Sequence, residues 1–93
     1  MSVDIEFDPD KRDRTLAERG LDFACAREVF AGPHLDWPDT RIDYGEDRYI
    51  TFGALAGCMV VMVWTPRGEA RRIISMRKAN EREQARIGPH LGV

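Results

Sequence analysis

Arg67-Gly-Glu-Ala-Arg-Arg-Ile-Ile-Ser-Met-Arg-Lys-Ala-Asn80 carries five Arg and Lys side chains within twelve residues, around a central pair of isoleucines. Ala70 to Met76 is predicted to form a β-strand that buries its middle and presents cations at both ends and in the preceding turn. Strand alternation predicts that Arg71 and Arg77 share one face and that Arg72 lies on the other. Fixed guanidinium groups bind polyanions, so the stretch predicts an anion-binding surface.

The preceding segments supply the neighbouring strands of an antiparallel meander. Arg48 to Phe52 and Cys58 to Trp64 are predicted strands, joined by a short hairpin loop from Gly53 to Gly57. Cys58 to Trp64 is apolar without alternation, which is typical of a central strand covered on both faces. Thr65 to Gly68 places proline second and glycine fourth, as in a type I turn, and this turn leads into Ala70 to Met76.

The N-terminal part of the chain predicts one strand and two helices. Val3 to Phe7 alternates apolar and polar residues, as a half-buried strand does. Asp8 is a good helix N-cap, and the helix it begins should run from Pro9 to Arg19, with Gly20 as its left-handed C-cap. A shorter helix, Phe23 to Phe30, carries the better apolar stripe.

The remaining segments predict a loop and a final helix. Leu35 to Asp47 is acidic and rich in turn residues, with Trp37-Pro38 as a candidate for a short edge strand. Asn80 to Glu83 has the capping-box pattern, and we expect the helix it begins to end near Ile87. Gly88 to Val93 is predicted to be a loose tail. Strands and helices that do not alternate indicate an α+β fold.

Composition indicates one ordinary globular domain spanning residues 1–93, with 43% hydrophobic and 32% charged residues. The longest apolar run, Cys58 to Trp64, is far too short to cross a bilayer, and the N-terminus resembles no signal peptide. Cys25 and Cys58 lack metal-type spacing and lie in apolar surroundings, so we expect buried, reduced thiols. These features predict a cytoplasmic protein that does not contact membranes.

The net charge of −2 conceals an asymmetry between the two halves of the chain. Residues 1–47 contain 6 basic and 13 acidic side chains, whereas residues 48–93 contain 8 basic and 3 acidic ones. The asymmetry predicts one face that attracts anions and another that attracts a basic partner. The alternative is that the halves interleave in space and their charges cancel.

Few residues other than the arginines offer chemistry. His34 and His90 are far apart and have no partners at metal-ligand spacing, and no phosphate-binding loop is present, so we expect no metal and no cofactor. Guanidinium groups could stabilise the phosphorane formed when a 2′-hydroxyl cleaves RNA. The leaving oxygen would also need a proton donor, for which Glu46, Tyr44 and Lys78 are candidates. The alternative is that the arginines form only solvated surface ion pairs.

Four motifs in order carry a resemblance to a known family: Phe7-Asp-Pro-Asp-Lys11, Gly20-Leu-Asp-Phe23, Asp39-Thr-Arg-Ile-Asp-Tyr-Gly-Glu-Asp-Arg48 and Arg72-Ile-Ile-Ser-Met-Arg-Lys-Ala79. Together they resemble the BrnT toxins of bacterial type II toxin–antitoxin systems. The resemblance spans about residues 4 to 87. Its most specific parts are the closing Arg-Ile-Ile-Ser-x-Arg-x-Ala and the Gly-Glu-x-Arg before the central strands.

This resemblance implies a RelE-like ribonuclease fold and a metal-independent endoribonuclease that cleaves mRNA and arrests translation. It also implies a BrnA-like antitoxin that neutralises the toxin in a 2:2 heterotetramer and supplies the only contact with DNA. The implied catalytic positions are Glu46, Arg48, Arg72 and Arg77. The basic residues themselves add an RNA-binding set, namely Arg67, Arg71, Lys78 and Arg82.

The sequence departs from the family pattern at two places. The first helix ends with Glu18-Arg19-Gly20 where the family commonly has Lys-His-Gly, and Ile87 stands where the family often has tyrosine. Both changes remove a potential proton carrier. The alternative function is therefore a catalytically decayed homologue that acts only as an antitoxin-binding partner in an autorepressor complex. A third possibility is an independent RNA- or protein-binding module.

Overall fold

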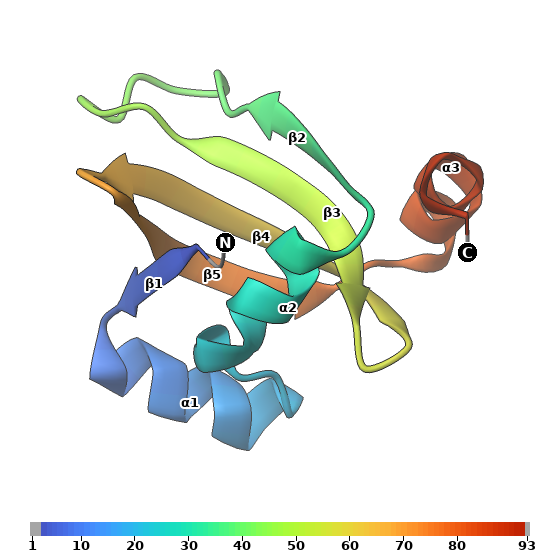
Figure 1. Ribbon diagram of the computed structural model, residues 1–93, viewed down its shortest axis with the longest axis horizontal. Coiled ribbons are helices and arrows are strands. Elements are labelled where there is room, and N and C mark those ends of the chain that lie inside the picture. The colour runs from blue at the N-terminus through green and yellow to red at the C-terminus, as the bar shows by residue number, and fades with distance from the viewer. Residues whose placement is uncertain (1–2, 93) are drawn as a thin grey trace.

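The computed structural model describes residues 3–92, which form a five-stranded mixed sheet with helices against both faces (Figure 1). The strands are β1 (Asp4–Phe7), β2 (His34–Pro38), β3 (Tyr49–Leu55), β4 (Cys58–Arg67) and β5 (Ala70–Lys78). The helices are α1 (Pro9–Arg19), α2 (Ala26–Ala31) and α3 (Glu81–Leu91), with a 3-10 turn at Phe23–Cys25. The predicted α+β class is confirmed.

The spatial order of the strands is β1-β5-β4-β3-β2. Neighbouring strands are antiparallel except β1 and β5, which run parallel. The sheet is therefore wider than the three-stranded unit predicted from residues 48–76, because β1 and β2 form its two edges. The edge strand predicted at Trp37-Pro38 is present, and it begins earlier, at His34.

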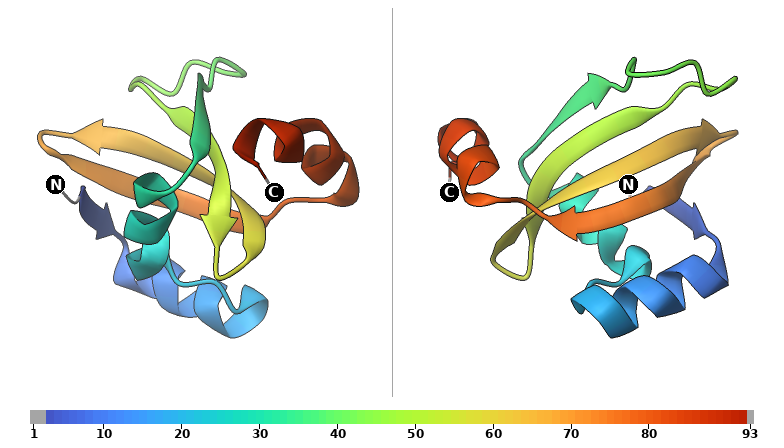
Figure 2. Two further views of the ribbon diagram at one scale, coloured as in Figure 1. Left: turned by 45° about the vertical axis from the view of Figure 1, so that its right-hand side comes forward. Right: turned by 180° about the vertical axis from the view of Figure 1, so that it is seen from behind.

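Strand β4 lies at the centre of the sheet and is covered on both faces, as its apolar run predicts. Val60, Met62 and Trp64 belong to the core on the α2 side, while Met59 and Val61 belong to a second core on the α3 side. The period of two along a strand sends alternate side chains to opposite faces. Two separate helix layers can therefore pack on one strand, and Figure 2 shows α3 on the side of the sheet away from α1 and α2.

The core on the α2 side is built from aromatic packing and a buried hydrogen-bond chain. Trp64 lies between Tyr49, whose ring stacks on it at 4.9 Å, and Phe30, which meets it edge-on at 5.5 Å. The indole Nε1 of Trp64 donates to the hydroxyl of the buried Thr51 at 2.7 Å, and this hydroxyl donates to Asp36. The buried polar groups are thus paired, as stability requires.

The predicted ends of α1 are confirmed. The Asp8 side chain accepts a hydrogen bond from the backbone nitrogen of Asp10, Pro9 begins the helix, and Gly20 ends it with a left-handed φ of 69°. No residue of α1 is buried, in agreement with its polar sequence. The second predicted helix begins instead as the 3-10 turn and becomes α-helical at Ala26.

The first predicted hairpin loop is shorter than expected, and the second turn is displaced. Gly53 lies within β3, and the β3–β4 turn is the tight pair Ala56-Gly57, both with positive φ, which matches the twist of the flanking strands. Pro66 lies within β4 and not in a type I turn, and the chain reverses at Gly68-Glu69 instead. Pro66 is tolerated because β4 extends past the end of β3 there, so its missing N–H is not needed.

The predicted facing of the arginines in β5 is wrong, because the strand contains a bulge. Val63 pairs with Ser75 and Trp64 pairs with Ile73, so Ile74 is an extra residue. A bulge inverts the alternation on one side of itself. Arg72 and Arg77 therefore lie on the α3 face together, and Arg71 lies on the opposite face.

The predicted loose tail is also wrong over its described part. Helix α3 continues to Leu91, and Ile87, Gly88 and Leu91 are buried against the sheet. Ile87 and Leu91 are four residues apart and so share one face of the helix. Val93 lies outside the described residues. Within residues 3–92, no helix is both long and apolar enough to cross a membrane.

The two cysteines are less buried than predicted. Cys58 opens β4 beside the tight turn and is exposed, and Cys25 is half-buried in the 3-10 turn. Burial raises the pKa of the Cys25 thiol. Both thiols are free.

Gly53 is required by the close approach of α2 to β3. A β-carbon at this position would lie 2.5 Å from Cγ1 of Val29 and 3.2 Å from Cβ of His34. We expect Gly53→Ala to lower the free energy of unfolding in urea by about 1–3 kcal/mol, because overpacking forces α2 away from the sheet. The matched control is Gly32→Ala, whose β-carbon would meet only a carbonyl oxygen at 3.8 Å. Equal stabilities of the two variants would contradict this account of the packing.

Candidate functional site

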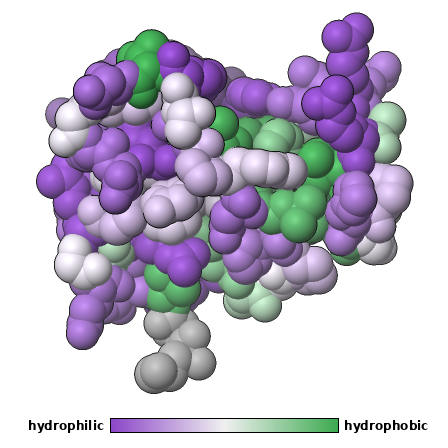
Figure 3. Space-filling model, turned by 90° about the horizontal axis from the view of Figure 1, so that it is seen from above, coloured by the Kyte–Doolittle hydropathy of each residue, from purple (hydrophilic) through white to green (hydrophobic). Residues whose placement is uncertain are grey.

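A cleft of about 710 Å³ separates α3 from its face of the sheet. Its floor consists of apolar side chains from the two central strands, namely Ile50, Phe52, Val61 and Val63. Trp37 of β2 closes one side, meets Phe52 edge-on at 5.5 Å, and is 43% exposed. Figure 3 shows hydrophobic surface in a hollow between hydrophilic ridges. The cleft therefore combines an open aromatic ring with an apolar floor.

Four guanidinium groups line the cleft: Arg41, Arg77, Arg82 and Arg86. They come from the β2–β3 loop, from β5 and from α3. Arg82 and Arg86 are four residues apart on α3 and make no ion pair within residues 3–92. The hydrogen bonds to Glu83 raise the pKa of Arg77, and the charge of Arg41 opposes this rise, so these two cations lie close enough to repel one another. The lining therefore attracts an anion.

Arg77 is held in place by Glu83. Its two terminal nitrogens each donate to one carboxylate oxygen of Glu83 at 2.8 Å, a bidentate geometry. Glu83 also accepts from the backbone nitrogen of Asn80, which completes the predicted capping box. The hydrogen bonds from Arg77 hold the pKa of Glu83 at about 2, below its usual 4.5. Glu83 is therefore a permanent anion near neutral pH and cannot donate a proton there.

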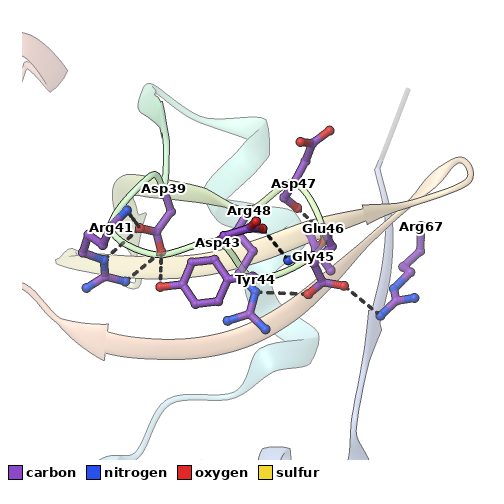
Figure 4. A network of polar contacts seen from close by, with 10 residues as sticks. Asp39, Arg41, Asp43, Tyr44, Gly45, Glu46, Asp47, Arg48 and Arg67 are labelled. Atoms are coloured by element: carbon purple, nitrogen blue, oxygen red, sulfur yellow. Dashed lines mark hydrogen bonds and ion pairs between the residues drawn. The ribbon is translucent and has the colours of Figure 1, made fainter.

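A second cationic cluster lies in the loop that precedes β3 (Figure 4). Glu46 accepts from Arg48 at 3.0 Å and from Arg67 at 3.4 Å, and the guanidinium of Arg48 lies 4.0 Å from the centre of the Tyr44 ring. The Tyr44 hydroxyl donates to Asp39 at 3.2 Å. The cluster therefore contains a carboxylate and a phenol beside one guanidinium.

The buried side chain of Asp39 anchors this loop. It accepts two hydrogen bonds from the Arg41 side chain, at 2.7 and 2.8 Å, in addition to the one from Tyr44. Arg41 holds the pKa of Asp39 at about 2. These hydrogen bonds hold the part of the loop from Asp39 to Tyr44 in place.

The loop cluster and β5 meet on the α3 face of the sheet. Arg48 directly precedes Tyr49, whose ring packs on the α2 side, so alternation places Arg48 on the α3 side. Thr65 pairs with Arg72 and donates its hydroxyl to the backbone of the same loop. Arg72 and Arg48 therefore lie on either side of Thr65 in neighbouring strands. Ser75 belongs to the next set of side chains on the same face, about 7 Å further along the strands.

The predicted catalytic residues thus lie on one face, but each guanidinium contacts a carboxylate. Arg48 bonds to Glu46 and Arg77 to Glu83, as described above. Arg72 donates to Glu6 of β1 at 2.7 Å. Carboxylate partners hold guanidinium groups in fixed orientations and also reduce their net positive potential.

The predicted RNA-binding residues are divided between the two faces. Arg82 lines the cleft and Arg67 joins the loop cluster. Arg71 lies on the α2 side, 4.3 Å from the centre of the Phe30 ring and 4.6 Å from that of Trp64. Lys78 is adjacent to Arg77 in a regular part of β5, so it faces away from the cleft. The bulge removes Arg71 from the group in which the sequence placed it.

Three residues of the cleft were missed by sequence reasoning. Arg86 could have been found, because it lies one helical turn after Arg82. Trp37 could have been found as an aromatic residue on an exposed edge strand. Arg41 carries no local signal, since only the folding of its loop brings it to the cleft.

Proton carriers are scarce in the described lining of the cleft. It contains no histidine, lysine or tyrosine, and Ile87 lines it where the family often has tyrosine. Arg19 stands at the end of α1, where the family commonly has histidine, and its side chain donates to the Met76 carbonyl oxygen. Within residues 3–92, no cluster of three metal-ligating side chains occurs. The groups best placed for proton transfer are Glu46 and Tyr44, beside Arg48.

The ion pair between Arg77 and Glu83 predicts a pH dependence of stability. The pKa of Glu83 is about 2 in the folded chain and 4.5 ordinarily, so its contribution is full above about pH 4.5 and is lost as the pH falls toward 2. We expect Glu83→Gln to be less stable than the wild type at pH 7, with the difference shrinking across this window. Thermal denaturation from pH 2 to 7 measures it.

The matched control is Glu81→Gln, in the same first turn of α3. Glu81 is exposed and makes no ion pair in the described part of the chain, so its substitution tests the effect of the helix dipole alone. A pH-independent difference for Glu83→Gln would show that the ion pair does not stabilise the fold.

Comparison with known proteins identifies the family of this chain. A family model described as "Ribonuclease toxin, BrnT, of type II toxin-antitoxin system" matches residues 7–83. A search of curated proteins returns no match. The matched region begins in β1, includes the loop cluster and β5, and ends at Glu83, so it contains most of the site. The chain belongs to the BrnT family of type II toxin–antitoxin ribonuclease toxins.

Proposed function

We propose that this protein is a cytoplasmic, metal-independent endoribonuclease toxin with a RelE-like fold that cleaves mRNA and thereby arrests translation. Membership of the BrnT family supports a ribonuclease toxin. The observation that carries the finer proposal is the shared face of Arg48, Arg72 and Arg77, on which the bulge at Ile74 brings Arg72 and Arg77 together. Of these three, Arg77 also lines the apolar cleft, which can accept an unstacked base.

Single-stranded RNA fits this surface better than a rigid double helix does. Single strands bind where a cationic groove follows the phosphates and aromatic side chains stack on the bases. Trp37 offers an exposed ring, and Arg82 and Arg86 offer guanidiniums without carboxylate partners among the described residues. The volume of the cleft, about 710 Å³, suits one or two nucleotides at a time.

The proposed reaction is transesterification by the ribose 2′-hydroxyl. Glu46 accepts the proton of this hydroxyl, its oxygen forms a bond to phosphorus, and the bond from phosphorus to the 5′-oxygen breaks. Tyr44 supplies the proton that the leaving 5′-oxygen takes up. The products are a 2′,3′-cyclic phosphate and a 5′-hydroxyl. Arg48, Arg72 and Arg77 stabilise the additional negative charge on the phosphorane.

We further propose that a BrnA-like antitoxin neutralises the toxin in a 2:2 heterotetramer and provides the only contact with DNA. A toxin–antitoxin family implies an antitoxin partner. The cationic cleft is a surface that an acidic partner can cover. Covering it would exclude RNA from the same guanidiniums.

A catalytically decayed toxin homologue is the second candidate. The observations that favour it are Ile87 in the cleft lining and the carboxylate partner of each proposed catalytic arginine. Incubating the purified protein with a 5′-labelled RNA in EDTA separates the two. Cleavage products ending in a cyclic phosphate support the nuclease, and intact RNA together with retained antitoxin binding supports the decayed homologue.

Removal of two arginines tests the assignment of the site. We expect Arg72→Ala/Arg77→Ala to abolish growth arrest on expression and to slow RNA cleavage at least ~100-fold, since one transition-state donor contributes about 10²–10³ in rate. The control is Lys11→Ala/Arg14→Ala on α1, which removes the same charge from exposed positions outside the cleft. Equal growth arrest by both double variants, with equal melting temperatures, would remove the site assignment.

Salt dependence separates phosphate contacts from base stacking. We expect Arg82→Ala/Arg86→Ala to reduce the slope of log affinity against log salt by about 1.4, since each single-strand phosphate contact contributes about 0.7. Trp37→Ala should weaken binding of a U10 oligonucleotide about 5–150-fold without changing this slope, the effect of losing ~1–3 kcal/mol of stacking. Trp37→Phe retains a ring and serves as its control. An unchanged slope in the arginine variant would place the phosphates elsewhere.

A further inference from the structure

The outer edge of β5 is paired along only half of its length. Strand β1 pairs with Ala70 to Ile73 and then ends at Phe7, where the chain turns into α1. From Ile74 to Lys78, β5 has no neighbouring strand on this side within residues 3–92. Figure 2 shows this open edge between the end of β1 and the start of α3.

The backbone groups that face the open edge can be identified. The carbonyl oxygen of Met76 accepts a hydrogen bond from the Arg19 side chain at 2.8 Å, so it points outward. The backbone nitrogen of Ala79 donates to Met59 of β4, so it points inward. Alternation along the strand then places the N–H and C=O groups of Met76 and Lys78 at the open edge, and those of Arg77 toward β4.

A groove of about 330 Å³ lies between this edge and α1. Ile74, Ser75 and Phe23 line it on the sheet side, and Thr15 lies on the α1 side. The groove exists because α1 buries none of its residues and therefore does not close against the sheet. It shares only Ser75 with the cleft, which lies on the α3 face.

The groove is positively charged. Lys11, Arg14 and Arg19 line it together with one acidic residue, Glu18. Lys11 and Arg14 make no ion pair within the described residues. Proteins usually blunt exposed edges with charges or bulges. Here the bulge lies at Ile74, where β1 ends, and so does not interrupt the exposed edge itself. From Ser75 to Lys78, β5 is again in regular register with β4.

We propose that an extended, acidic segment of a partner protein adds to the open edge of β5 as a strand in line with β1 and places its side chains in the α1 groove. The edge offers backbone N–H donors and C=O acceptors in alternation, and within residues 3–92 the C=O groups of Met76 and Lys78 accept hydrogen bonds only from the side chains of Arg19 and Arg77. A polypeptide strand complements this alternation, whereas an RNA backbone, whose phosphates are acceptors, does not. The proposal rests on the proposed function for its partner, because the antitoxin is the protein expected to bind. It assigns that partner a second surface, away from the cleft.

Binding of a synthetic acidic strand tests the proposal. The probe is acetyl-Glu-Val-Glu-Val-Glu-Val-Glu-amide, titrated into ¹⁵N-labelled protein at low salt. We expect shift changes at Ile74 to Lys78 and along α1, with slower hydrogen exchange at the amides of Met76 and Lys78 but not of Arg77. A probe N-methylated at its valines cannot pair as a strand, and should bind at least ~10-fold more weakly.

Charge reversal supplies the matched variants. We expect Lys11→Glu/Arg14→Glu to weaken binding of the acidic probe at least ~10-fold, and Lys11→Arg/Arg14→Lys, which keeps both positive charges, to leave it within ~2-fold. Binding without protection of the Met76 and Lys78 amides, or equal binding of the N-methylated probe, would overturn the proposal.

The competing occupant of the groove is RNA. If a U10 oligonucleotide displaces the probe, and Lys11→Glu/Arg14→Glu weakens U10 binding, the groove belongs to the nucleic-acid surface and the proposal is wrong. Failure of the probe to bind leaves the nuclease proposal intact, because that proposal depends on Arg72 and Arg77. Conversely, if the wild-type protein does not cleave RNA, the result of the strand-addition experiment is unaffected.

Discussion

One extra residue in β5 decides which side of the sheet each arginine serves. Because Ile74 bulges out opposite the step from Val63 to Trp64, the alternation of side chains is inverted on one side of it. Arg72 and Arg77 then share the α3 face, whereas Arg71 packs on Phe30 and Trp64. Without the bulge, Arg71 would join Arg77, and Arg72 would lie against the α2 core. The proposed site depends on this local departure from regular strand geometry.

The ion pairs show how the acidic and basic halves of the chain are combined. Arg72 bonds to Glu6, and Arg67 bonds to Glu46, so cations from the second half are matched by carboxylates from the first. The halves thus interleave in part, as one of the two alternatives predicted. Interleaving is incomplete, because Arg82 and Arg86 line the cleft without such partners among the described residues. The carboxylates orient the paired guanidiniums, while the unpaired ones provide the attraction for an anion.

Sequence reasoning succeeded where the determining interactions are local or repeat along the chain. The caps at Asp8 and Gly20 each depend on a few neighbouring residues, and both ends of α1 were predicted correctly. The run from Cys58 to Trp64 identified the central strand. Reasoning failed at Pro66, whose turn preference yields to strand pairing, and at α3, where Ile87 and Leu91 are held by the sheet and not by local signals.

The sequence by itself determined the α+β class, the basic character of the last strand and, through its motifs, the resemblance to BrnT toxins. These follow from periodicity, capping and residue identity, which are properties of short segments. Only the tertiary structure decided that Arg41, Trp37 and Arg86 meet around one cleft, and that β5 leaves half an edge unpaired. Both depend on the register of the strands and on the residues at which β1 and α1 end. Pairing between distant segments sets these quantities, and no single stretch of sequence encodes them.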